Sequence, residues 1–161
     1  MDETVVQWDN SYSVGVRLVD DQHMELINIT NKLFNSCKAS QEEVKRAFLE
    51  TIQEAVDYTG YHFGTEEKIM EKVDFPDMLT HKKEHHDFVR EVFGREAELK
   101  AGKPIVPLSF ANFLKDWVLN HIAVNDKKMG DYLIKMQRNG ELHKITLKVR
   151  KDEFTDRFII K

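Results

Sequence analysis

The feature that most constrains this chain is a long helical stripe in the segment that begins at Ser40 and runs to about Val73. Its core-type positions alternate spacings of four and three, which is the period of a seam between packed helices. Two members of the stripe are polar and one helical turn apart. The stripe consists of Phe48, Ile52, Ala55, Thr59, His62, Glu66, Ile69 and Val73. It predicts a helical bundle with polar groups in its core.

Three other segments have helical periodicity, and most of the glycines and prolines fall between the segments. The first runs from about 20 to 37, with Asp20 as a candidate N-cap and His23 on its core stripe. The second starts with Pro76 and ends near Gly102, and the last runs to about Arg138. We therefore predict an all-α protein, an up-down-up-down four-helix bundle with an irregular N-terminal arm and a short C-terminal extension.

A chain of 161 residues with 41% hydrophobic residues suits one domain. We expect the bundle to occupy residues 1–140, including the arm at 1–19. Residues 141–161 form the C-terminal extension, whose alternating apolar residues fit either a hairpin or an extra helix.

The two remaining helices also carry polar residues on their core stripes. His81 and His85 are four apart, so they point the same way on a helix. His121 and Asp126 are five apart, which places them about 140° apart on an ideal α-helix. A π-type turn would bring both onto the core side, and such turns often occur at functional sites. The alternative is an ideal helix from which both side chains reach sideways.

These stripes place five imidazoles and two carboxylates in the core, and no Lys or Arg on the stripes can neutralise the acids. Burying such groups unpaired costs a few kcal/mol each, which is heavy for a domain stable by about 5 to 15 kcal/mol. A metal site explains the pattern. Seven ligands exceed the four of a tetrahedral zinc site, which indicates two ions, and the mixed imidazole and carboxylate set suits iron or manganese. The candidate ligands are His23, His62, Glu66, His81, His85, His121 and Asp126.

Charge and composition exclude other classes. The formal net charge is -4 and the basic residues are interleaved with acids, which disfavours nucleic acid as a partner. The N-terminus lacks the pattern of a signal peptide, and no apolar run is long enough to span a bilayer, so we expect a cytoplasmic protein without a membrane partner. The single cysteine, Cys37, cannot form an internal disulfide.

Four short motifs make the sequence similar to the hemerythrin family. They are "DDQH" ending in His23, "HFGTEE" with His62 and Glu66, "HKKEH" with His81 and His85, and "HIAVND" with His121 and Asp126. The segment "WDNSYSVGV" from Trp8 also resembles the arm of that family, and the likeness covers about residues 5–137. The extension beyond Gly140 has no role in this resemblance.

The resemblance implies two non-haem iron ions with an oxo or hydroxo bridge and dioxygen as ligand. One iron would be bound by His81, His85 and His121, and the other by His23 and His62, while Glu66 and Asp126 bridge both. Counting these ligands leaves one position open at the second iron, where dioxygen would bind. The candidate apolar wall of that pocket consists of Ile27, Phe63, Trp117 and Ile122.

The expected function is reversible dioxygen binding by a carrier, storage or delivery protein that is not an enzyme. Two other classes use the same type of site: an oxygen or redox sensor that signals through the arm or tail, and a di-iron nitric oxide or peroxide reductase. No output module is present in the sequence, which favours the carrier. The C-terminal extension offers a contact for a homodimer or a protein partner.

Overall fold

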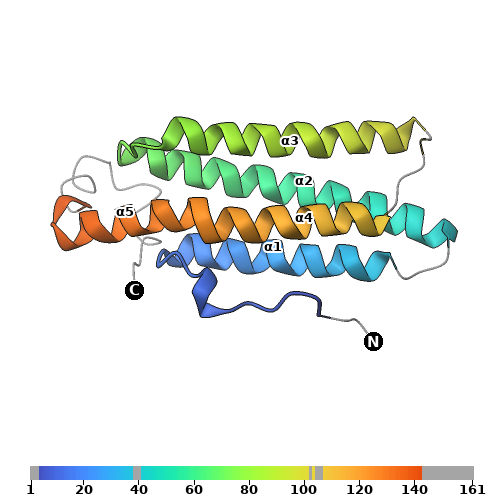
Figure 1. Ribbon diagram of the computed structural model, residues 1–161, viewed down its shortest axis with the longest axis horizontal. Helices are drawn as coiled ribbons and strands as arrows, with labels where there is room; N and C mark the ends of the chain where they lie inside the picture. Colours follow the sequence, from blue (N-terminus) through green and yellow to red (C-terminus); the bar gives the residue numbers. More distant parts are fainter. Residues whose placement is uncertain (1–3, 38–40, 102, 104–106, 143–161) are drawn as a thin grey trace.

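Four helical rods run alternately up and down, side by side (Figure 1). The structure is a computed structural model that describes residues 4–37, 41–101, 103 and 107–142. The elements are the 3-10 turn η1 (Asn10–Tyr12), α1 (Arg17–Ser36), α2 (Gln41–Lys72), α3 (Met78–Lys100), α4 (Pro107–His121), the π-helical segment η2 (Ile122–Asp126) and α5 (Lys127–Arg138). Because α4, η2 and α5 form one continuous rod, the predicted all-α, up-down-up-down four-helix bundle is confirmed.

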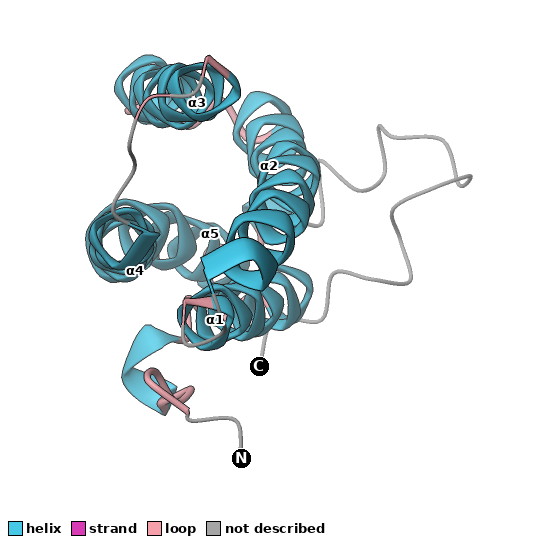
Figure 2. Ribbon diagram, turned by 90° about the vertical axis from the view of Figure 1, so that its right-hand side faces the viewer, coloured by secondary structure: helices cyan, strands magenta, loops and turns pink. Residues whose placement is uncertain are grey.

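The end-on view shows how the helices surround a shared interior (Figure 2). Helix α1 packs against α2 and α4, and α2 packs against α3. The two larger apolar clusters of the described core contain Leu33 and Phe63 in one and Val19 and Ile69 in the other. His23 lies between the two clusters along α1. The bundle therefore has a polar layer with an apolar cluster on either side of it.

Helix α1 begins at Arg17, three residues before the predicted start, and Asp20 is not its N-cap. The carboxylate of Asp20 instead accepts hydrogen bonds from the amide of Val14 at 2.8 Å and the hydroxyl of Ser13 at 2.7 Å. Val14 and Val16 are fully buried. Their burial draws the end of the arm against the bundle, so the helix starts earlier and Asp20 fastens the arm from inside the first turn.

The beginning of the arm is held to α1 by one side chain. The Asn31 Oδ1 atom accepts from the amides of Val5 and Val6 at 3.0 and 2.9 Å, and its Nδ2 atom donates to the Val6 carbonyl at 2.8 Å. The backbone groups of Val5 and Val6 are satisfied in this way by a side chain. The arm therefore has a fixed path along α1.

The arm also makes a backbone contact with α5 that only glycine allows. A Cβ atom on Gly130 would lie 2.2 Å from the carbonyl oxygen of Val14, closer than any real contact of this kind. Gly15, the next residue of the arm, has a φ of 77°, a conformation that other residues rarely adopt. These two glycines let the arm lie directly on α5.

Several sequence expectations lie outside the described residues. The cap at Ser40 and the form of residues 143–161 belong to this group, so the predicted hairpin or helix stays a prediction. Helix α3 begins two residues after Pro76. Within the described chain, no helix has the length and apolar content needed to cross a membrane.

We predict that Gly130→Ala destabilises the protein by about 1 to 3 kcal/mol, because the new methyl group overpacks the contact with Val14. Gly94→Ala is the matched control, since a Cβ there meets nothing within 4 Å in the middle of α3. It should stabilise the protein by roughly 0.5 to 1 kcal/mol. Urea unfolding measures both, and equal effects would contradict the close packing of arm and α5.

Candidate metal centre

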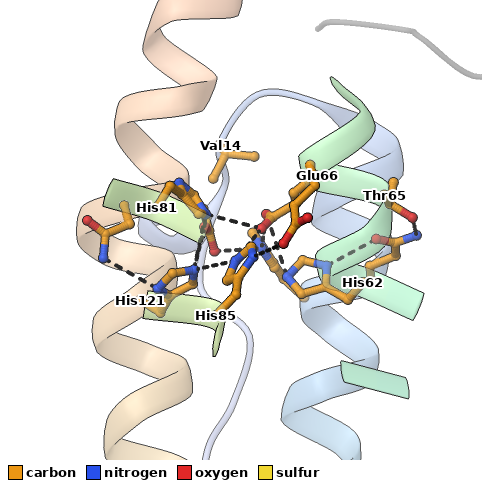
Figure 3. A network of polar contacts seen from close by, with 12 residues as sticks. Val14, His62, Thr65, Glu66, His81, His85 and His121 are labelled. Carbon is orange, nitrogen blue, oxygen red and sulfur yellow. Dashed lines mark hydrogen bonds and ion pairs between the residues drawn. The ribbon is translucent and has the colours of Figure 1, made fainter. Parts of the chain in front are cut away.

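The structure brings all seven predicted ligand residues together in the polar layer. Figure 3 shows His62, Glu66, His81, His85 and His121 directed toward one another. None of them is more than 3% exposed. They come from four rods of the bundle: His23 from α1, His62 and Glu66 from α2, His81 and His85 from α3, and His121 and Asp126 from the α4–η2 rod. His86, the neighbour of His85, is exposed.

Local helix geometry positions these groups. The pairs His62–Glu66 and His81–His85 use the four-residue spacing of an α-helix, so both members face the interior. Of the two alternatives for His121 and Asp126, the structure has the π-type turn, because residues 122–126 are π-helical and the Lys127 amide donates to the carbonyl of Ile122, five residues earlier. One extra residue in the turn lets His121 and Asp126 both face the interior.

Each oxygen of Glu66 faces a different group of histidines. The Oε1 atom lies 3.7 Å from His23 Nε2 and 3.6 Å from His62 Nε2. The Oε2 atom lies 3.4 Å from His81 Nε2 and 3.3 Å from His85 Nε2. The carboxylate therefore stands between two sets of imidazoles.

Asp126 divides its oxygens in the same way. Its Oδ2 atom lies 3.1 Å from His23 Nε2, while its Oδ1 atom lies 3.2 Å from the Nε2 atoms of both His81 and His121. The residues thus form a three-histidine set (His81, His85 and His121) and a two-histidine set (His23 and His62), with one oxygen of each carboxylate directed to each set.

The three-histidine set has the spacing of ligands around one ion. The His121 Nε2 atom lies 3.0 Å from His85 Nε2 and 3.2 Å from His81 Nε2. When two metal–nitrogen bonds of about 2.1 Å are at right angles to each other, the two nitrogen atoms are about 3 Å apart. Hydrogen bonds alone explain this arrangement of the three Nε2 atoms poorly. One shared proton joins only two of the nitrogens, so the third nitrogen has no donor.

Unpartnered buried atoms provide a second test of whether metal ions fit. Among the described residues, both ring nitrogens of His23 and all carboxylate oxygens of Glu66 and Asp126 are buried without a hydrogen bond of acceptable geometry. Buried polar atoms are normally satisfied. Imidazole nitrogens and carboxylate oxygens are donors that metal ions accept, so two cations would satisfy atoms that the protein leaves unpaired.

The same atoms have strongly perturbed pKa values. Burial acts to lower the pKa of His23 and His81, but the carboxylates of Asp126 and Glu66 outweigh burial and raise both to about 9. Burial lowers the pKa of His62 to about 4. Although burial favours the neutral acids, the neighbouring imidazoles hold the pKa of Glu66 and of Asp126 well below the usual range. The carboxylates are therefore anions, and a metal ion would replace protons on His23 and His81.

Aromatic rings cover two of the imidazoles. Phe63 stacks on His85 with 3.7 Å between ring centroids, and Trp117 stacks on His121 at 4.4 Å. These two residues belong to the predicted apolar wall, but they stack on imidazoles of the three-histidine set, whereas the open position was predicted at the two-histidine set. Phe63 also lies near that set, with its ring centroid 5.8 Å from that of His62.

The other two members of the predicted wall are placed differently. Ile122 packs with Leu26 and Val118 in a small apolar cluster. Ile27 lines a groove of about 800 Å³ between the arm, α1 and α2, together with Trp8. Leu26, the neighbour of Ile27, belongs to the cluster of Ile122, and the role of Ile27 in a dioxygen pocket stays a prediction.

Three residues that contact the imidazoles from behind were not identified from the sequence. Gln22 accepts a hydrogen bond from His62 Nδ1 at 3.0 Å, Glu67 accepts from His85 Nδ1 at 3.2 Å, and Glu84 accepts from His121 Nδ1 at 3.3 Å. Each stands next to a candidate ligand in the sequence. That adjacency is the signal that could have found them, although many surface residues share it.

The fold and the site together define a class: a four-helix bundle protein whose core could hold two cations between histidines and shared carboxylates. The family model described as the hemerythrin HHE cation binding domain matches residues 14–133. The chain belongs to the hemerythrin family, as the resemblance of its motifs predicted.

Individual relatives agree with this assignment. The chain is 32% identical over 125 residues to the bacteriohemerythrin of Stenotrophomonas maltophilia (strain R551-3), covering 77% of this chain and 78% of the relative. It is 30% identical over 121 residues to a hemerythrin-like protein of Naegleria gruberi, covering 75% and 87%. A crystal structure of wild-type hemerythrin superposes with a TM-score of 0.73 at 27% identity, covering 79% of this chain and 96% of that one.

The π-helical segment generates a prediction about chain length. Deleting the exposed Ala123 leaves His121 and Asp126 four apart, so an ordinary α-helix presents both to the interior and the variant should keep its fold and metal content. Inserting an alanine at the same point turns Asp126, Met129 and Leu133 about 100° from the core. We expect the insertion to lose several kcal/mol of stability, since each displaced core side chain costs about 2 to 5 kcal/mol.

Circular dichroism, urea unfolding and metal analysis compare the two variants. If the deletion loses metal and stability as the insertion does, the π-type turn is needed for more than the phase of the rod.

The raised pKa values generate a prediction for the metal-free protein. His23 and His81 hold protons up to about pH 9 when folded, whereas unfolded histidines release them near pH 6.5. This stabilisation is present below pH 6.5 and is lost as the pH rises through 9. Each pKa unit corresponds to about 1.4 kcal/mol per group.

Urea unfolding of chelator-treated protein at pH 6.5 and pH 9 measures this loss. The metal-loaded protein is the control and should change little, because its imidazoles carry no proton at the metal-facing nitrogen. A metal-free protein that is equally stable at both values would contradict the raised pKa values.

Proposed function

We propose that this protein binds dioxygen reversibly at a centre of two non-haem iron ions. The ligands would be His81, His85 and His121 for one ion and His23 and His62 for the other, with Glu66 and Asp126 shared. Iron is favoured because five imidazoles and two carboxylates in a bundle core are a donor set that suits it.

The observation that carries the proposal is the unequal division of donors. Three imidazole nitrogens and one oxygen of each carboxylate would hold one ion, whereas the other ion would have two imidazole nitrogens and the remaining two oxygens. Of two ions with the same preferred coordination, the second therefore has more room for a ligand from outside. Ferrous iron would supply the electrons that a reversible bond to dioxygen requires.

Burial favours a very small ligand. The seven residues are at most 3% exposed. The 800 Å³ groove beneath the arm includes none of them among its lining residues. A smaller apolar cavity of about 160 Å³ lies between α2 and α3 beside Phe88, which stacks on Trp117 with 4.0 Å between centroids. These features suit dioxygen better than an organic substrate, and they favour a binding protein over an enzyme that acts on an organic substrate.

The protein side chains around the centre would have two tasks. Phe63 and Trp117 exclude water from the imidazoles that they cover, which slows irreversible oxidation. Imidazoles are neutral donors, so the set carries less negative charge than a carboxylate-rich set and stabilises high iron valences less. Both tasks support release of dioxygen unchanged.

A sensor that signals through the arm is the second candidate. Lys127, which follows Asp126 in the chain, donates a hydrogen bond to the carbonyl of Ser13 at 2.8 Å. A movement of Asp126 would therefore be transmitted to the arm through the adjacent Lys127 and its hydrogen bond to Ser13. This route gives the sensor a specific contact that a carrier does not need.

The test is anaerobic reconstitution with Fe(II), followed by iron analysis and optical spectra as oxygen is added and then removed under vacuum. We expect two irons per chain, one dioxygen per two irons, and a visible band that disappears on deoxygenation. A band that persists under vacuum, or that never forms, would overturn reversible binding and favour the redox sensor or a nitric oxide or peroxide reductase.

Two histidine variants locate the site. His85→Ala removes an imidazole of the three-histidine set and should lose iron and the reversible band. His86→Ala removes an exposed imidazole from the same helix and should behave as the unmodified protein. Circular dichroism verifies that both variants fold, so a lost band can be assigned to the site.

A further inference from the structure

The two histidine sets differ in the groups that accept hydrogen bonds from the Nδ1 atoms of their imidazoles. With Nε2 directed at the centre, the Nδ1–H group of a ligand histidine is free to donate outward, and its acceptor fixes the ring and changes its basicity. In the three-histidine set two of these acceptors are carboxylates, whereas the acceptor in the two-histidine set is an amide.

The carboxylates of the three-histidine set are themselves held in place. Glu67 accepts from His85 Nδ1 through Oε1, and its Oε2 atom forms an ion pair with Lys82 at 2.9 Å. Glu84 accepts from His121 Nδ1 and also from the side-chain amide of Asn125. Glu67 is partly buried, with 25% of its side chain exposed, so its charge is only partly screened by solvent.

The two-histidine set has a neutral outer shell. Gln22, which is 3% exposed, accepts from His62 Nδ1 at 3.0 Å, and its Nε2 atom donates to the Thr65 hydroxyl at 3.3 Å. That hydroxyl donates in turn to the carbonyl of Tyr61 at 3.0 Å. The Nδ1 atom of His23 makes no hydrogen bond within the described part of the chain. Among the described residues, therefore, no anionic side chain accepts a hydrogen bond from the Nδ1 atom of His23 or His62.

A carboxylate acceptor makes an imidazole a stronger donor than an amide acceptor does, because it draws the Nδ1 proton away from the ring. A stronger donor stabilises the higher charge of an oxidised ion. We propose that Glu67 and Glu84 are positioning residues that orient His85 and His121 and stabilise the oxidised state of the ion bound by the three-histidine set. This inference rests on the proposed di-iron site. It assigns the carboxylates of Glu67 and Glu84 to the ion that has fewer free coordination positions.

The test replaces the charge and keeps the acceptor. Glu67→Gln and Glu84→Gln retain a carbonyl oxygen for the Nδ1–H group, as Gln22 provides at the other set. Glu71→Gln is the matched control, because it removes the same charge from an exposed residue one turn from Glu67. Iron content and the midpoint potentials of the iron-loaded proteins are measured, the latter by anaerobic redox titration.

We expect each outer-shell variant to keep two irons and to shift its redox equilibrium roughly 10-fold toward the ferrous state, a rise in midpoint potential of about 59 mV per one-electron step. Glu71→Gln should leave the potential nearly unchanged. Unchanged potentials in both outer-shell variants would overturn the inference, as would an equal shift in the Glu71 control, which would indicate a long-range charge effect only.

The experiment distinguishes failure of this inference from failure of the proposed function. If the unmodified protein binds two irons but does not release dioxygen, reversible binding fails while the potentials still decide the role of Glu67 and Glu84. If dioxygen binding is reversible and the potentials do not move, only the outer-shell inference fails. A protein that binds no iron would overturn both.

Discussion

The structure depends on two carboxylates that are completely removed from solvent. Glu66 and Asp126 are both 0% exposed, and among the described side chains no lysine or arginine forms an ion pair with either. Within the described part of the chain, the ion-pair partners of these oxygens are all imidazoles. The cost of burying the two carboxylates is therefore balanced by groups that can carry either protons or metal ions. Apolar clusters on both sides of the polar layer supply the stability that such a layer requires.

The candidate site was readable from the sequence because its residues replace apolar side chains in otherwise regular stripes. His62 and Glu66 interrupt a seam in which the flanking Ile52 and Ile69 are buried as the periodicity predicts. The irregular step between His121 and Asp126 was readable for the same reason, since a rod with apolar residues on both sides must keep its buried face in phase. Periodicity therefore predicted the helices and the inward-facing polar groups, and it located the irregular step without deciding between a π-type turn and an ideal helix.

The remaining features depend on contacts between elements, which periodicity does not encode. Glu67 and Glu84 resemble the other acidic residues of a charged helix surface until the neighbouring helix places an imidazole beside them. Asp20 matched the signal of an N-cap, but the burial of Val14 gave it another partner. Gly130 similarly has no visible role until the backbone of the arm lies on it. Each of these residues contacts a partner in another element, and that contact exists only in the folded chain.

The division of each carboxylate between the two sets also has a consequence for how the centre is filled. An ion that enters one set orients Glu66 and Asp126, and the other oxygen of each is then already directed toward the second set. Both carboxylates therefore lose side-chain entropy when the first ion binds, and binding of the second ion does not require this loss again. At the proposed centre we therefore expect cooperative filling, in which a chain population given too little iron holds more empty and full molecules than half-filled ones.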